Sequence, residues 1–432
     1  MELSITVLLV TFFGLLALGV PISVCIGLTT IATMLLTIDF VPAMTTVAQR
    51  MAGGLDSFAL LAIPFFVLSG LLMGRGGIAK RMIEFAKVLI GMLPGGLALV
   101  NVISCALFGA ISGSAVAATS AIGSFMIPAM NKEGYDRNFN AAITVASSTT
   151  GLLIPPSNIL IIYSLAAGGV SIAALFVAGY LPGLLVTLGL MCVCGVYAKV
   201  KRFPVGPKPT LKEVLARSWE AMPSLALVII VIGGIVGGYV TATEAGVLAV
   251  LYSGFLSVVV YKEVKISELP EIFVKSAETT AVVLLLIGSS TAMSWILSYE
   301  TIPQSLSASL LSLTDNPLMI LLLINVILLL VGVFMDMTPA VLIFTPIFLP
   351  IAESLGISPL HFGIIMVLNL CIGLCTPPVG SVLFVGCSVA KTSIHHLVKP
   401  LMPMYLTMIL ALVLVSFFPA ISEFLPEFFG LM

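Results

Sequence analysis

The amino-acid sequence predicts an all-α, polytopic membrane protein made of two inverted repeats, and two observations lead to this prediction. The chain has 432 residues, of which 60% are hydrophobic and only 9% are charged, whereas soluble proteins average about 25% charged residues. The second half also repeats the first at a constant spacing of 222 residues: Pro128, Gly134, Gly151, Pro155 and Pro156 recur as Pro350, Gly356, Gly373, Pro377 and Pro378. Duplicated, interrupted hydrophobic helices are typical of transporters.

Apolar segment lengths predict five membrane crossings in each half, because a bilayer core of about 30 Å needs roughly 20 apolar residues per crossing. The ten crossings are expected at 3–19, 21–38, 56–73, 138–168 and 171–198, and at 222–240, 243–261, 278–298, 360–390 and 401–421. Those at 138–168 and 360–390 each contain a Pro-Pro pair, which removes backbone donors, so each is expected to be broken. The first repeat is therefore expected at 1–198 and the second at 218–432, with a cytoplasmic linker at 199–217.

Two further apolar segments, 96–130 and 317–352, are predicted to be re-entrant hairpins. In each, two apolar arms are joined by a short polar tip, at 111–115 and 334–339. An arm of 16 residues rises about 24 Å, which brings the tip deep into the membrane. Non-helical backbone at that depth is tolerated only where it is buried or lines a cavity.

The distribution of Lys and Arg predicts the orientation in the membrane. With the linker in the cytoplasm, 17 of the 18 basic residues fall on the cytoplasmic side, leaving Arg50 outside to contact an external partner or lipid phosphate. Both termini are then periplasmic. Three amphipathic stretches, at 78–92, 262–276 and 300–314, are expected to lie in the interface as arms between a fixed frame and a mobile part, or else as connecting loops.

Polar residues of the hairpins and broken crossings predict two Na⁺ sites, because Na⁺ needs oxygen ligands and unwound helices supply carbonyl groups. The first site is expected to comprise Ser112, Gly113, Ser114, Gly151, Pro155 and Pro156. The second is expected to comprise Asp336, Thr338, Gly373, Thr376 and Pro377. Asp336 is the strongest candidate because a carboxylate at membrane depth is usually functional. The alternative is that it only caps the following helix.

Half-helix N-termini after the Pro-Pro pairs carry partial positive charge and predict an anion site. Its expected residues are Ser157, Asn158, Pro378, Val379 and Gly380. No Lys or Arg is expected within the membrane, so helix dipoles and bound cations would attract a carboxylate substrate. Asp56 and Glu278 open equivalent crossings and are interpreted as helix caps rather than ligands.

Other functional classes are disfavoured. The basic residues stand in short clusters between apolar runs, so nucleic-acid binding is excluded. An intramembrane enzyme using Ser112 or Ser114 as nucleophile would need a paired His or Lys, and neither tip has one. The seven cysteines form no CxxC pair, and no catalytic residue is predicted.

Six motifs, in order along essentially the whole chain, resemble the large membrane subunit of tripartite ATP-independent periplasmic (TRAP) transporters, the DctM-type family. They lie at Asp56 to Phe66, Ser112 to Ala117, Ile154 to Ser157, Thr241 to Gly246, Met335 to Pro339 and Thr376 to Gly380. Many members of that family carry an Asp shortly after the first tip, where this chain has Ala117 and Ala118. The first ion site is therefore expected to depend on neutral oxygens.

The resemblance implies an elevator-type transporter of the ion-transporter superfamily, located in a bacterial inner membrane and coupled to Na⁺. It also implies a periplasmic binding protein (P-type) that delivers an organic acid, and a separate small four-helix membrane subunit (Q-type). The resemblance implies sialic acid (a SiaM-like branch) as the first candidate substrate, with C4-dicarboxylates, other sugar acids and ectoine-like solutes remaining open. A self-sufficient Na⁺- or H⁺-coupled carboxylate carrier is the alternative.

Overall fold

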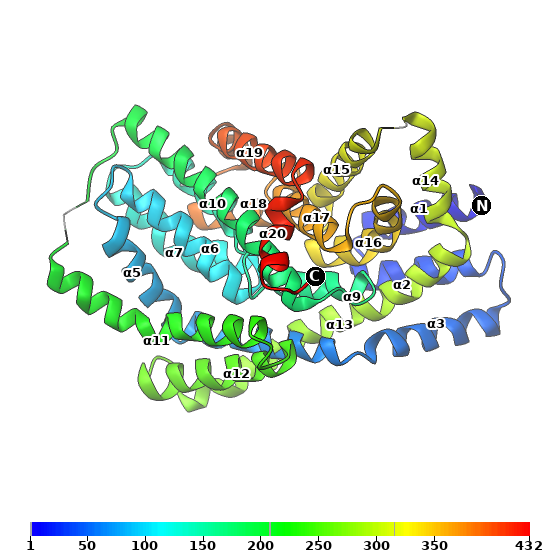
Figure 1. Ribbon diagram of the computed structural model, residues 1–432, viewed down its shortest axis with the longest axis horizontal. Coiled ribbons are helices and arrows are strands. Elements are labelled where there is room, and N and C mark those ends of the chain that lie inside the picture. Colours follow the sequence, from blue (N-terminus) through cyan, green and yellow to red (C-terminus); the bar gives the residue numbers. More distant parts are fainter. Residues whose placement is uncertain (1, 207–208, 315) are drawn as a thin grey trace.

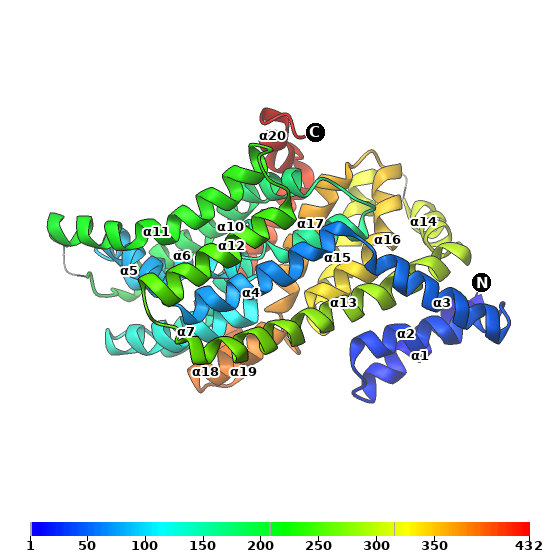
Figure 2. The same cartoon turned by 90° about the horizontal axis from the view of Figure 1, so that it is seen from below.

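The computed structural model describes residues 2–206, 209–314 and 316–432. These residues form helices, and the described part contains no β-strand beyond one isolated bridge between Pro94 and Val205. Figure 1 shows the two helical hairpins, α6 with α7 and α15 with α16, on either side of the centre of the molecule. Seen from below in Figure 2, α4 and α3 run one after the other across the near face of the molecule, with α13 beside them. The predicted all-α class with two repeats, each containing a hairpin and a broken helix, is confirmed.

The helices of the first half are α1 (Glu2–Ala17), α2 (Ile22–Met34), α3 (Phe40–Leu55), α4 (Ala62–Arg75), α5 (Ile78–Ile90), α6 (Gly96–Ser112), α7 (Ala115–Lys132), α8 (Arg137–Thr150), α9 (Asn158–Ala166) and α10 (Ile172–Lys201). Those of the second half are α11 (Leu211–Val236), α12 (Ala242–Phe255), α13 (Leu269–Tyr299), α14 (Ile302–Leu313), α15 (Pro317–Phe334), α16 (Met337–Ser354), α17 (Pro359–Leu374), α18 (Ser381–Ala390), α19 (Ile394–Phe417) and α20 (Ala420–Phe428). Short helical turns lie at η1 (Phe58–Leu61), η2 (Leu256–Val260) and η3 (Ile266–Glu268). Of the expected linker, residues 207 and 208 lie outside the described part.

The spacing of 222 residues relates these helices in detail. It maps α7 onto α16 at both ends, and it maps the first residue of α8, Arg137, onto the first residue of α17, Pro359. Helix–helix contacts follow the same relation: α7 contacts α18, and its counterpart α16 contacts α9. Each hairpin is therefore packed against the broken helix of the other repeat.

Hydrogen bonds also cross between the repeats at equivalent places. At the start of α8, Arg137 donates through Nε to the carbonyl oxygen of Ala390 at 2.7 Å and through Nη2 to that of Lys391 at 2.8 Å. At the start of α17, the carbonyl oxygen of Pro359 accepts a bond from the Tyr163 hydroxyl at 2.5 Å. These bonds tie the ends of the two broken helices together, so the hairpins and broken helices form one packed body.

The two halves differ at α13. In the first half the chain breaks at Asp56, between α3 and α4, but the corresponding residue Glu278 lies inside the continuous helix α13. The expectation that Glu278 opens a helix is therefore wrong. Gly53 and Gly54 precede the break, and their counterparts are Lys275 and Ser276. Glycine disfavours helix by about 1 kcal/mol per residue, so the second half lacks the local signal that ends α3.

The described residues contain eight helices long and apolar enough to cross a membrane, which identifies a multi-pass membrane protein. Helices α1 and α2 are too short to be among them, and α2 with 13 residues is only about 20 Å long. The halves of the broken helices are also short. Helices α15 and α16 qualify by length, and the tip between them lines a cavity of the protein, as described below.

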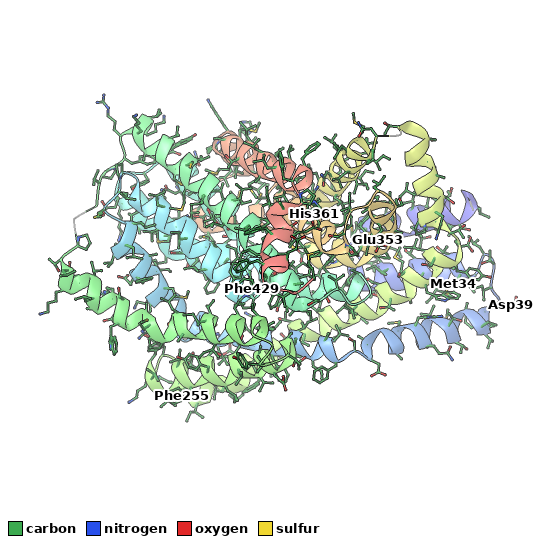
Figure 3. The ribbon with its side chains drawn as sticks, in the orientation of Figure 1. Met34, Asp39, Phe255, Glu353, His361 and Phe429 are labelled. Atoms are coloured by element: carbon green, nitrogen blue, oxygen red, sulfur yellow. The ribbon has the colours of Figure 1, made fainter. Side chains whose placement is uncertain are left out.

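The short C-terminal helix α20 folds back over the start of α17. Figure 3 shows the labelled side chain of His361 in α17 close to the ribbon of α20. The His361 imidazole Nδ1 lies 2.6 Å from the Ser422 hydroxyl, and Ser358 donates a hydrogen bond to Glu423. These contacts satisfy polar groups at the start of α17 and fix one end of the second broken helix.

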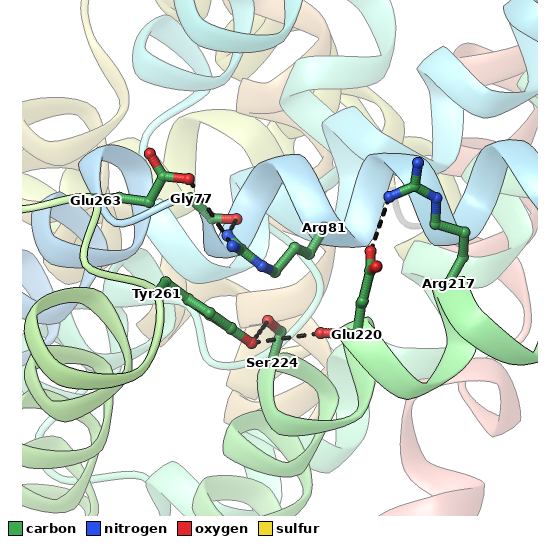
Figure 4. Close-up of polar contacts among 7 residues, drawn as sticks. All are labelled: Gly77, Arg81, Arg217, Glu220, Ser224, Tyr261 and Glu263. Atoms are coloured by element: carbon green, nitrogen blue, oxygen red, sulfur yellow. Dashed lines mark hydrogen bonds and ion pairs between the residues drawn. The ribbon is translucent and has the colours of Figure 1, made fainter.

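Helix α5, one of the predicted interfacial arms, packs against α11 and contacts the segment after α12. Figure 4 shows Arg81 above the ring of Tyr261, with 3.6 Å between its guanidinium carbon and the ring centroid. Arg81 also lies 3.8 Å from Glu263, and the Tyr261 hydroxyl lies 3.2 Å from that of Ser224. The start of this arm is therefore held against the outer helices rather than being an independent loop.

Candidate functional site

A cavity of about 830 Å³ lies between the hairpin tips and the helices α4, α7 and α13. Both tips line it, the first through Ser112, Gly113 and Ser114 and the second through Asp336 and Thr338. The first residues of the half-helices α9 and α18, Asn158 and Ser381, line it as well. The tips and the two half-helix N-termini therefore converge on one space, although they are far apart in sequence.

The first tip is shaped by Gly113, which ends α6 with a φ of 63°. A positive φ strains any residue with a β-carbon, so the turn favours glycine. Ser114 then caps α7, because its hydroxyl accepts a hydrogen bond from the Ala117 backbone N–H at 3.2 Å. The tip lies close to Asn158, since a β-carbon at Gly113 would stand 2.5 Å from the Asn158 Nδ2 atom.

The first broken helix contributes Asn158 to the cavity but not Ser157. The Ser157 side chain is fully buried, and its hydroxyl donates to the carbonyl oxygen of Leu152 across the break. The Pro155–Pro156 peptide bond is cis, and Pro156 faces a void of only about 10 Å³ on the side of α4, α11 and α12. By contrast, the Asn158 Oδ1 atom is buried without a hydrogen-bond partner.

At the second tip, Asp336 occupies the N-cap position of α16, with φ −69° and ψ 159°. Its carboxylate makes no side-chain capping hydrogen bond, and its exposed surface faces the cavity. Among the described residues that line the cavity, Asp336 carries the only negative charge.

The second broken helix turns most of its unwound segment away from the cavity. Gly380 donates its N–H to the carbonyl oxygen of Val333 at 3.1 Å, and Thr376 donates its hydroxyl to that of Ile372 at 2.7 Å. Pro378 and Val379 are exposed but do not line the cavity. Of this element, Leu374, Ser381 and Val382 do, and the Ser381 hydroxyl is buried without a partner.

Glycine pairs bring each hairpin arm into backbone contact with its broken helix. A β-carbon at Gly151 would lie 2.5 Å from the α-carbon of Gly109, and one at Gly373 would lie 2.5 Å from that of Gly332. These four residues do not line the cavity. The two glycines named in the predicted ion sites, Gly151 and Gly373, thus set the approach of the arm to the break.

The structure brings together only part of the predicted site. Predicted residues that line the cavity are Ser112, Gly113, Ser114, Asn158, Asp336 and Thr338. Predicted residues that do not line it are Gly151, Pro155, Pro156, Ser157, Gly373, Thr376, Pro377, Pro378, Val379 and Gly380. Among the predicted residues of the anion site, only Asn158 lines the cavity; the Ser157 hydroxyl and the Gly380 N–H instead bond the carbonyl oxygens of Leu152 and Val333.

Sequence reasoning missed six polar residues of the cavity: Arg75, Ser120, Ser124, Lys275, Thr279 and Ser381. Ser381 could have been predicted as a site residue, because it is the first residue of the half-helix that follows Gly380. Arg75, at the end of α4, and Lys275, in α13, place two basic side chains on the cavity wall.

The donor set is compatible with a hard monovalent cation. It consists of hydroxyl and amide oxygens and one carboxylate, with Asn158 Oδ1 and Ser381 Oγ lacking partners. The described residues contain no cluster of three or more His, Cys, Asp or Glu side chains. Buried oxygens without partners are unfavourable unless a ligand satisfies them.

Comparisons with known proteins agree with this architecture. The family model described as the DctM component of the tripartite ATP-independent periplasmic transporter matches residues 9–421. A solved structure of the YdaH transporter of Alcanivorax borkumensis aligns with a TM-score of 0.65 at 15% identity, covering 87% of each chain. At that identity the likeness concerns the fold alone.

Curated relatives cover nearly the full length. The protein YgiK of Salmonella typhimurium is 51% identical over 99% of this chain and 98% of its own. The C4-dicarboxylate TRAP transporter large permease protein DctM of Pseudomonas aeruginosa is 41% identical over 87% of this chain and 88% of its own. The sialic acid TRAP transporter large permease protein SiaM of Vibrio cholerae is 39% identical over 97% of both chains. The chain therefore belongs to the DctM family, the large permease component of TRAP transporters, and is a transporter subunit rather than an enzyme.

Proposed function

We propose that this chain is the transport subunit of a Na⁺-coupled TRAP transporter that imports a small organic acid by an elevator movement. The convergence of both hairpin tips and both half-helix N-termini on one cavity, where Asp336 is the one carboxylate among the described lining residues, is the observation that carries the proposal. Family membership supports the transport class, and the cavity supports the choice of ions and substrate.

Na⁺ binding would serve to neutralise the site. Asp336 places a negative charge at the second tip, and the unpartnered oxygens of Asn158 and Ser381 offer neutral donors nearby. Moving a charged site through a membrane is costly, so a loaded and neutral site would move more readily than an empty one. Two Na⁺ ions are proposed, one at each tip, with the first held by neutral oxygens alone.

We propose an elevator movement in which a core slides along a frame. The core comprises the hairpins and broken helices, α6–α9 and α15–α18, which pack across the repeats. The frame includes α4 and α13, which line the cavity together with the tips and contact the hairpins at α6 and α16. Sliding of the core along the frame would carry the tips from one side of the membrane to the other.

The working transporter is proposed to have three components in the inner membrane and periplasm. The family description calls its members one component of a tripartite periplasmic transporter. A periplasmic binding protein would deliver the substrate, and a small four-helix membrane subunit would brace the frame. Both termini are proposed to be periplasmic, because this orientation leaves almost all basic residues in the cytoplasm.

The substrate is proposed to be a carboxylate, with sialic acid as the first candidate. The relative named for sialic acid is 39% identical and one named for C4-dicarboxylates is 41% identical, so identity does not separate these substrates. The common feature of the two substrate classes is a carboxylate group, which suits the partial positive charge at the starts of α9 and α18.

The test is reconstitution of this chain with its small subunit in liposomes, followed by uptake of labelled sialic acid and of a panel of C4-dicarboxylates and sugar acids. Uptake is expected to require an inward Na⁺ gradient and the binding protein. Uptake without the binding protein would indicate a self-sufficient carrier instead. Uptake that is indifferent to Na⁺ would refute the coupling.

A further inference from the structure

We propose that Arg75 and Lys275 form a second anion-binding site on the frame, which takes the substrate carboxylate as it leaves the hairpin tips. This inference rests on the proposed function, since it takes the cavity to be the substrate path. Arg75 and Lys275 are the only basic residues among the described residues that line the cavity. They belong to α4 and α13, so they do not travel with the core.

Arg75 lies close to the first hairpin. At its neighbour Gly74, a β-carbon would stand 3.4 Å from the ring of Phe108, and Phe108 lies about one helical turn before Ser112 in α6. The cationic end of α4 is therefore beside the arm that ends in the first tip. If the core slides along α4, the first tip would lie near Arg75 in the state seen here and away from Arg75 in the other state of the transport cycle.

Both basic side chains can accept an anion without losing a strong partner. Arg75 pairs with Glu271 at 2.6 Å, but the two side chains are 39% and 68% exposed, and exposed pairs contribute little to stability. A guanidinium has five N–H donors, so it can bind a carboxylate while keeping this pair. Lys275, one helical turn after Glu271, forms no ion pair within 4.0 Å in the described part of the chain.

Hydroxyl groups line the walls between the tips and this site. Ser120 and Ser124 stand one turn apart on α7, and Thr279 stands one turn after Lys275 on α13. Ser124 donates to the carbonyl oxygen of Ala121, and Thr279 donates to that of Lys275, both at 2.9 Å. The oxygens of such hydroxyls remain able to accept bonds from water that accompanies the substrate.

The charges give this site a role in release. While Na⁺ is bound, the charge of Asp336 is balanced, and the substrate is held near the tips. Once Na⁺ leaves, Asp336 repels a carboxylate, whereas Arg75 and Lys275 attract it. Charges in physiological salt act over a screening length of about 8 Å. The ligand class is accordingly an organic carboxylate. The headgroup of an anionic phospholipid has similar charge and is the alternative source.

The experiment uses the complete reconstituted complex and measures inhibition of net uptake by substrate loaded inside the liposomes. In the double variant Arg75→Gln with Lys275→Gln, the internal substrate concentration that halves uptake is expected to rise about tenfold, because the releasing side loses two charges. The Na⁺ concentration for half-maximal uptake is expected to stay unchanged. Lys275→Arg keeps the charge and should therefore show the wild-type internal inhibition, whereas Lys275→Gln should not.

Lys265→Gln provides the matched control, because Lys265 precedes α13 and does not line the cavity. An unchanged internal inhibition constant in an active double variant would overturn the inference. So would a variant effect that disappears in vesicles without anionic lipid, since the cations would then serve lipid headgroups. Absence of Na⁺-driven uptake by the wild-type complex would instead refute the proposed function itself.

Discussion

The backbone of Gly113 and the side-chain amide of Asn158 lie so close that a β-carbon at position 113 would stand 2.5 Å from the Asn158 Nδ2 atom. This contact joins the first hairpin tip to the first residue of α9, across the break in the first repeat. Asn158 also has a buried Oδ1 without a partner on the same cavity. The position of the tip and the availability of this oxygen are therefore coupled.

The substitution Gly113→Ala is expected to abolish Na⁺-driven uptake while the protein remains folded. The new β-carbon would displace Asn158, and a φ of 63° adds about 1–2 kcal/mol of local strain for alanine. Uptake by the reconstituted complex measures the effect. Gly134→Ala is the control, because Gly134 has a φ of 83° but no atom within 4 Å of its β-carbon position. Equal loss in both variants would attribute the effect to strain alone.

Asp336→Asn is expected to remove Na⁺-driven uptake, because an amide cannot balance the charge of the bound cation. The comparison is Asp39→Asn. Asp39 is the N-cap of α3, with φ −61° and ψ 155°, and likewise makes no capping hydrogen bond. Figure 3 places it at the outer end of the molecule. Full Na⁺-driven uptake by Asp336→Asn would exclude this carboxylate from coupling.

Ser381→Ala is expected to raise the Na⁺ or substrate concentration for half-maximal uptake about tenfold, as befits the loss of one buried oxygen ligand. The hydroxyl has no partner in the protein, so its removal should not lower stability. Initial uptake rates at varied Na⁺ and substrate concentrations provide the measurement. Ser388→Ala, on an exposed position of the same helix, should leave both concentrations unchanged. Identical kinetics for the two variants would show that Ser381 is not a ligand.

Arg137→Ala is expected to lower the free energy of unfolding by about 1.5 kcal/mol, the low end for hydrogen bonds to a charged group, because Arg137 is exposed. Its guanidinium bonds the last carbonyl groups of α18 and so links the repeats. Thermal unfolding of the purified protein in detergent, followed by intrinsic fluorescence, measures the change. Removing the exposed pair of Arg217 and Glu220 with Arg217→Ala should cost about 0.5 kcal/mol. A larger loss in Arg217→Ala than in Arg137→Ala would contradict this account.

Much of the fold could be predicted because the repeated prolines and glycines mark where helices stop. The tips at Ser112 to Ser114 and at Asp336 are visible in sequence as polar interruptions of apolar arms. Helix α3 was missed, although the spacing of 222 residues relates it to the amphipathic stretch 262–276. That stretch was in turn expected to end before Glu278, whereas its later part runs into α13 without interruption.

The candidate site was less accessible to sequence reasoning. A Pro-Pro pair shows that a helix unwinds, but it does not show which side of the unwound segment faces the tip. Packing of Gly109 against Gly151 decides that orientation, and it leaves Ser157 bonded to Leu152. Arg75 and Lys275 were missed for a similar reason, since only the tertiary arrangement shows that α4 and α13 form the cavity wall.

Because the helix breaks at Asp56 but continues through Glu278, the two repeats are no longer structurally equivalent at this position. The first half of the chain has α3 followed by α4 with a break between them, while the second half has a single helix of 31 residues, α13, which packs against both. A chain assembled from two copies of the second half would have two such continuous helices and no break. The second repeat therefore has a continuous helix where the first repeat has an interruption at which the chain can bend.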